Sequence, residues 1–102
     1  MKINRAKDPE SMIDFEKKHT PSIERISRKV IVNVGSGIEH PMNPEHFIEW
    51  VELFINDESV DVKELDSEDR PSVTFELDSE PLPTDKIKAH IHCNIHGTWE
   101  SL

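Results

Sequence analysis

The chain has 102 residues, of which 34% are hydrophobic and 32% charged, so it can form one domain with a small core. Its formal net charge of -9 and its lack of a basic cluster argue against nucleic-acid binding. No apolar run is long enough to span a membrane or to act as a signal peptide, and the single cysteine, Cys93, excludes an internal disulfide. We therefore expect a cytoplasmic protein that binds neither nucleic acid nor membranes.

The first part of the chain is polar and has only a weak apolar stripe. We expect this N-terminal segment, residues 1–14, to be loose or to form a short helix. The remainder, residues 15–102, is expected to be a single domain.

Strand patterns, with β-branched or alternating apolar residues, occur at four places in that domain. The first is the clearest and ends at a Gly-Ser-Gly turn, and the second is the weakest. Two prolines between residues 78 and 85 predict a loop before the last strand. The four expected strands are Lys29–Val34, Val60–Leu65, Val73–Leu77 and Ile87–His92.

Residues 47–55 are ambiguous. Phe47, Trp50, Val51 and Phe54 recur at helical spacing, which on periodicity alone favours a helix. Six of the nine residues are aromatic or β-branched, which favours a strand. The residues themselves leave both interpretations open.

Three short stretches carry the residues with the most distinctive chemistry. They are Lys-His-Thr-Pro at residues 18–21, His-Pro-Met-Asn-Pro-Glu-His at residues 40–46 and Cys-Asn-Ile-His at residues 93–96. Together they supply four imidazoles and one thiolate, and a Cys-x-x-His turn can bring its two side chains to one metal ion. Each stretch alone is a weak signal, because histidines in a proline-rich loop are often only surface residues.

The three stretches, in this order, resemble the iron centre of the superoxide reductases, the neelaredoxin and desulfoferrodoxin family. The resemblance runs from about Phe15 to Trp99 and implies that residues 15–102 are a superoxide reductase-like domain with one mononuclear non-haem iron. It implies a strand at residues 47–55, and so an all-β fold, an immunoglobulin-like antiparallel β-sandwich. The ligands it implies are four equatorial imidazoles and one axial thiolate, opposite an open position: His19, His40, His46, His96 and Cys93.

The resemblance also implies the reaction, the one-electron reduction of superoxide to hydrogen peroxide. Lys18 would attract the anion, and an external donor such as rubredoxin would return the electron. The family's pattern is Glu-Lys-His, whereas this chain has Glu16 separated from Lys18 by a second lysine, so the role of the family's glutamate as a ligand of oxidised iron is in doubt here. Single-domain members are often homo-oligomers, tetramers or dimers.

Two other functions fit the same donor residues. A copper electron-transfer site could use His46, Cys93 and His96, although no methionine follows His96. A structural zinc site could use Cys93 and three histidines as a closed tetrahedral set.

Four further residues are predicted to have no part in the chemistry. His90 and His92 share one side of their strand, opposite Cys93, and we expect both to be exposed. The two tryptophans, Trp50 and Trp99, are expected to be core residues.

Overall fold

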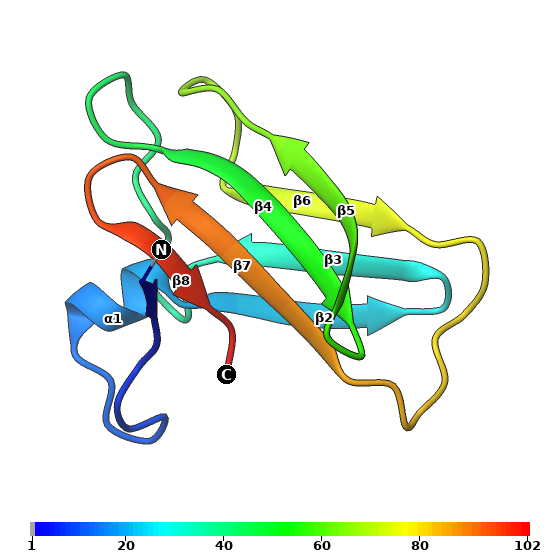
Figure 1. Ribbon diagram of the computed structural model, residues 1–102. Coiled ribbons are helices and arrows are strands. Elements are labelled where there is room, and N and C mark those ends of the chain that lie inside the picture. Colours follow the sequence, from blue (N-terminus) through cyan, green and yellow to red (C-terminus); the bar gives the residue numbers. More distant parts are fainter. Residues whose placement is uncertain (1) are drawn as a thin grey trace.

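The β-branched run Lys29–Val34 forms the central strand of a three-stranded antiparallel sheet, as its composition predicts (Figure 1). The computed structural model describes residues 2–102. In this small sheet, the central strand alternates strictly and buries Val30, Val32 and Val34. The strands in spatial order are β2 (Pro21–Ile26), β3 (Lys29–Val34) and β6 (Ser72–Glu76).

A second sheet of five strands packs across the first, and their facing sides make the core (Figure 1). Neighbouring strands of this sheet are antiparallel except at one edge, where β1 runs parallel to β8. The strands in spatial order are β1 (Ile3–Asn4), β8 (Gly97–Glu100), β7 (Ile87–Cys93), β4 (Ile48–Ile55) and β5 (Glu58–Glu64).

The connections β3–β4, β5–β6 and β6–β7 each pass from one sheet to the other, whereas β4–β5 and β7–β8 are hairpins. This crossing pattern, on two packed antiparallel sheets, is that of an immunoglobulin-like sandwich. The predicted all-β fold class is therefore confirmed. The four predicted strands are present within a few residues of their expected ends, and residues 77–86 form the expected loop.

The ambiguous stretch is strand β4, and its irregular pattern has a structural cause. It buries Ile48, Val51 and Leu53, so the first two inward residues are three apart instead of two. The register against β7 shifts between Ile48 and Trp50, a bulge that inserts one extra residue. This insertion shifts the alternation by one position. The apparent helical spacing combines this shift with apolar residues on the opposite face, where Trp50 packs on His92 and Phe54 packs on His90.

The N-terminal part of the chain lies against the large sheet. Ile3 and Asn4 pair with Thr98 and Trp99 of β8, and Ala6 is buried. The only helix within residues 2–102, α1 (Asp14–His19), follows and brings the chain to the small sheet. It is neither long nor apolar enough to cross a membrane. The proposed boundary at residue 14 stays a prediction.

Candidate metal centre

His19 is the last residue of α1, and the helix fixes its ring. The Nδ1–H donates to the carbonyl of Phe15, one turn earlier, at 2.7 Å, which leaves the lone pair on Nε2. The helix start is held by Glu16, whose carboxylate oxygens accept from the backbone N–H groups of Ile13 and Lys7, both at 3.2 Å. This carboxylate therefore connects the N-terminal segment to the helix that carries His19.

His40 follows a turn that only glycine can make. Gly35 has φ of +119°, and a Cβ there would lie 2.0 Å from the carbonyl oxygen of Ile38. The turn returns the chain to β3, where the N–H of His40 donates to Val34 at 3.2 Å. The ring donates Nδ1–H to the carbonyl of Pro41 at 2.7 Å, so that Nε2 is again the free acceptor.

His46 closes a tight turn that begins at Asn43. The two residues exchange backbone hydrogen bonds at 3.1 Å, and the Asn43 side chain also accepts from the His46 N–H at 3.0 Å. Pro44 occupies the second position of this turn, where its fixed φ is favourable. The prolines therefore bend the loop so that His40 and His46 face one point.

Cys93 ends β7 and is fully buried, and His96 lies three residues later in the turn to β8. The sulfur lies 3.8 Å from Nδ1 of His96. Asn94 ties this turn to the loop of His46: its side chain accepts from the N–H of Phe47 and donates to the carbonyl of Glu45, both at 3.0 Å. The two histidine-bearing loops are thus fixed to each other.

The five side chains converge on one point. Neighbouring ring centroids are 4.8 Å apart for His19 and His40, 4.7 Å for His40 and His46, 5.1 Å for His46 and His96, and 4.9 Å for His96 and His19. His19 and His46 lie on opposite sides of this group of four imidazoles, with ring centroids 6.1 Å apart. Donor atoms of His19, His40, His46 and Cys93 all lie within 4.8 Å of one another, and Nδ1 of His96 is 3.1 Å from Nε2 of His19.

Three of the imidazoles, those of His19, His40 and His46, have lowered pKa values, which favours the neutral form that a metal ion requires. Burial lowers the pKa of His40 to about 4, against the opposing effect of its bond to Pro41. Burial also lowers the pKa values of His19 and His46, and repulsion from His96 and Lys18 adds to both. A neutral ring keeps the lone pair with which it can bind a metal.

The residues fit a bound metal. The Nε2 atoms of His40 and His46 are buried and have no hydrogen-bond partner. Such atoms cost free energy unless a ligand satisfies them. Four imidazoles with one thiolate form a donor set that suits a borderline-soft transition metal.

Lys18 is exposed, and its charge acts on two of the assigned ligands. Its ammonium contributes to the lowered pKa of both His19 and His46, which lie on opposite sides of the group of four imidazoles. Lys17 is half-buried, and no such effect of it is resolved. Glu16 is engaged with backbone N–H groups at the other end of the helix, so its carboxylate does not face the centre as a free group.

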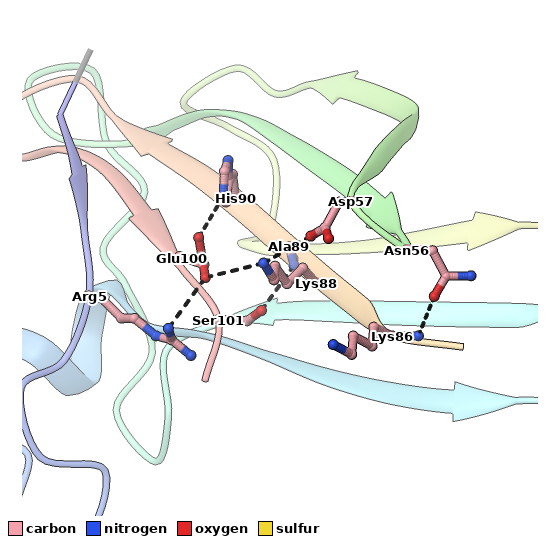
Figure 2. A network of polar contacts seen from close by, with 9 residues as sticks. All are labelled: Arg5, Asn56, Asp57, Lys86, Lys88, Ala89, His90, Glu100 and Ser101. Atoms are coloured by element: carbon pink, nitrogen blue, oxygen red, sulfur yellow. Dashed lines mark hydrogen bonds and ion pairs between the residues drawn. The ribbon is translucent and has the colours of Figure 1, made fainter. Parts of the chain in front are cut away.

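The prediction that His90 is exposed is wrong, although it does lie on the face opposite Cys93. Its side chain is only 16% exposed, and Nε2 lies 3.1 Å from the carboxylate of Glu100. Figure 2 shows that the same carboxylate also faces Lys88 and Arg5, at 3.9 and 3.7 Å. The ring packs on Phe54, with centroids 4.6 Å apart.

His92 is likewise half-buried, at 27%. Its Nδ1 lies 2.8 Å from the hydroxyl of Thr98 and its Nε2 lies 3.5 Å from Glu49. It stacks on Trp50, which therefore lies on the outer face of the large sheet. The prediction that Trp50 is a core residue is wrong. Trp99 is a core residue, as expected, and also stacks on the ring of His19.

The role of Phe15 was missed from sequence. Its ring is 4.6 Å from the ring of His19 and 4.9 Å from that of His96, yet the residue is 42% exposed. The four-residue spacing to His19 on a helix was the available signal. Nothing local indicates the contact with His96, which is far along the chain.

Comparison with known proteins gives one consistent result. The family model described as desulfoferrodoxin matches residues 11–102. A desulfoferrodoxin homologue of Archaeoglobus fulgidus is 44% identical over 86 residues, 84% of this chain, and a superoxide reductase of Pyrococcus horikoshii is 36% identical over 100 residues, covering 82% of this chain and 84% of that protein. The chain spans 63% of the length of the Archaeoglobus relative. The crystal structure of the superoxide reductase from Treponema pallidum superposes with a TM-score of 0.70 at 38% identity, covering 84% of this chain and 67% of that one.

Proposed function

The chain belongs to the desulfoferrodoxin family, and on this premise we propose that it is a superoxide reductase with one mononuclear iron centre. One observation carries the proposal: four imidazoles and one cysteine sulfur converge, and two of the converging nitrogens are buried without a partner. Nothing else in the described chain satisfies those nitrogens. A bound metal ion would satisfy them.

Each ligand is assigned by the atom that the fold leaves available. His19 and His40 hold their Nδ1–H groups on backbone carbonyls and therefore offer Nε2. His46 offers its unpartnered Nε2, and His96 offers Nδ1, the nitrogen nearest the sulfur. Cys93 supplies the thiolate. When bound, ferrous iron would supply the single electron that reduces superoxide, and the thiolate would tune how readily it does so.

Lys18 is proposed as the residue that acts on the substrate. An exposed ammonium whose field reaches both His19 and His46 also attracts a small anion to the mouth of the centre. It matters more because the molecule as a whole carries a charge of -9, which repels superoxide. Product formation consumes one electron and two protons per superoxide, and water at the exposed ammonium is the proposed proton source.

The remaining parts of the proposal concern partners and location. An external one-electron donor, such as a rubredoxin, must return the electron after each turnover. We propose cytoplasmic action and assembly as a homo-oligomer, a dimer or tetramer, with neither nucleic acid nor membrane as partner.

Reconstitution with iron under anaerobic conditions tests this function. We expect one iron per chain, a visible thiolate–ferric band after oxidation, and one hydrogen peroxide formed per superoxide consumed, without release of dioxygen. Half a peroxide per superoxide, with dioxygen released, would indicate dismutation instead. Preferential binding of copper with an intense blue band, or of zinc in a colourless protein, would remove the proposal.

A further inference from the structure

The charges of the chain are divided unevenly between the end that holds α1 and the rest. The first twenty residues contain five basic and four acidic residues, a net charge of +1. The other 82 residues contain seven basic and seventeen acidic residues, a net charge of -10. An acidic partner is therefore repelled by most of the surface and least repelled at the N-terminal end.

The same end exposes two apolar side chains, one of which contacts assigned ligands of the metal centre. Ile13 at the start of α1 is 63% exposed and Phe15 is 42% exposed. The acidic residues of the helix, Asp14 and Glu16, lie in its first turn. Lys17 and Lys18 follow in the last turn, at helical neighbours of Ile13 and Phe15, so the cations border the apolar surface at the end of the helix that carries His19. We call these four residues, Ile13, Phe15, Lys17 and Lys18, the α1 patch.

Phe15 joins this patch to the metal ligands. The residue is 42% exposed, while its ring lies within 5 Å, centroid to centroid, of two ligand imidazoles, those of His19 (4.6 Å) and His96 (4.9 Å). Three of the five assigned ligands are buried and two are half-buried: His19, His40 and Cys93, and His46 and His96. A protein resting on Phe15 is thus separated from two ligands by a single aromatic ring.

We propose that the α1 patch is the docking surface for a small acidic electron-carrier protein. This inference rests on the proposed function, because only a turnover cycle needs a donor. The charge distribution selects an acidic carrier: a basic one would be held on the acidic remainder of the surface, away from the centre. Transfer across the patch moves one electron, so that the donor's metal is oxidised by one unit, this chain's ferric centre is reduced by one unit, and no proton or group is exchanged.

Binding can be measured without any turnover. The probe is a zinc-substituted rubredoxin of net negative charge, titrated into the ¹⁵N-labelled, iron-loaded parent protein. We expect the largest chemical-shift changes outside the paramagnetically broadened region in residues 2–14, next to the patch. A zinc-substituted basic c-type cytochrome is expected to perturb the acidic sheet surfaces instead.

A matched pair of variants tests the location. Ile13→Glu places a carboxylate in the patch, and Leu82→Glu places one at a position of nearly equal exposure, 63% against 62%. Leu82 lies in the β6–β7 loop, at the end of the sandwich remote from α1 (Figure 1). Neither side chain belongs to the assigned ligands, and iron content and the visible spectrum check that the centre is intact.

We expect Ile13→Glu to weaken rubredoxin binding about tenfold, the effect of losing one central contact, and to slow reduction of the ferric centre by reduced rubredoxin to a similar extent. Leu82→Glu should change both by less than twofold. Equal behaviour of the two variants, or no binding to the parent, would overturn the docking proposal even if the parent reduces superoxide. Failure of the parent to reduce superoxide would overturn the proposed function, while the binding data would still decide the surface.

Discussion

The six histidines fall into two groups that are both shielded from solvent and yet differ in one respect. In the metal centre, His19 and His40 bond one ring nitrogen to a backbone carbonyl, and the other nitrogen faces only further imidazoles or nothing. On the outer face of the large sheet, His90 and His92 face carboxylates and pack on aromatic rings. Burial alone therefore does not identify a ligand. A buried nitrogen without a hydrogen-bond partner, as in His40 and His46, does.

Cys93→Ser should have the largest effect on iron binding and activity, because it removes the thiolate and keeps all four imidazoles. The change is nearly isosteric, so the buried site should still fold. Loss of an outer-shell partner typically costs 10–100-fold in affinity or activity, and the loss of a direct ligand should exceed about 100-fold in activity. Iron content, the thiolate band and superoxide consumption measure it. Full turnover would remove the axial role from Cys93.

His40→Ala and His90→Ala compare the two groups directly. The first should lower iron affinity by more than about tenfold, since it deletes a nitrogen that the fold reserves for the metal. The second deletes a ring that bonds Glu100 and packs on Phe54, and should leave iron content unchanged. His92→Ala should behave like His90→Ala. If either outer-face variant lost its iron, the division into two groups would be wrong.

Acid should destabilise the metal-free protein because the histidines of the metal centre resist protonation in the folded state. The pKa of His40 is about 4 in the folded protein, lowered by burial from an ordinary value of 6.5. Between these values the unfolded chain binds a proton that the folded chain does not, so the free energy of unfolding falls as the pH is lowered from about 6.5 toward 4. The pKa values of His19 and His46 are lowered in the same direction and add to the loss.

Chemical denaturation of the metal-free protein at several pH values measures this loss. In His40→Gln the dependence on pH should be shallower over the same range, because one of the shifted groups is gone. An unchanged slope would mean that other groups cause the acid sensitivity.

Local pattern was sufficient for the strands that alternate and insufficient where geometry breaks the alternation. Strand β3 is evident from its β-branched residues. In β4, a bulge and aromatic residues on the outer face together gave a helical period. Strand β2, at the edge of the small sheet, and strand β8, between β1 and β7 in the large sheet, were not predicted. The first begins with a proline and is mostly exposed, so it lacks a strong alternation, and the second is only four residues long.

The site residues were recognisable because three short stretches together resemble the iron centre of a known family, but their surroundings were not. The first stretch supplies one ligand and each of the other two supplies a pair, and all five assigned residues converge in the structure. The partners of His90 and His92 are distant in sequence, which is why both were expected to be exposed. The clamp made by Asn94 between two loops also depends on pairing that no local pattern reveals.

The smallest expected effect concerns Lys18, whose charge acts on the histidines of the metal centre. Lys18→Glu changes the local charge by two units, which a few ångströms away in water is worth on the order of 1 kcal/mol, or roughly a fivefold slower reaction with superoxide. Lys18→Ala should be milder, about twofold. The losses should shrink as salt rises, because the screening length falls from about 10 Å at 0.1 M to about 3 Å at 1 M.

Lys17 provides the control, since it is the next ammonium on the same helix. It is half-buried and has no resolved influence on the pKa values of the imidazoles, so Lys17→Ala alone should change the rate little. Once Lys18 is gone, Lys17 becomes the nearest cation and partly replaces it, so the double change to alanine should cost more than the sum of the single changes. Pulse-radiolysis rates for the four variants across ionic strength measure this coupling. Rates equal to the parent at every salt concentration would mean that the charge of the centre alone attracts the anion, and that the exposed ammonium has no part in the reaction.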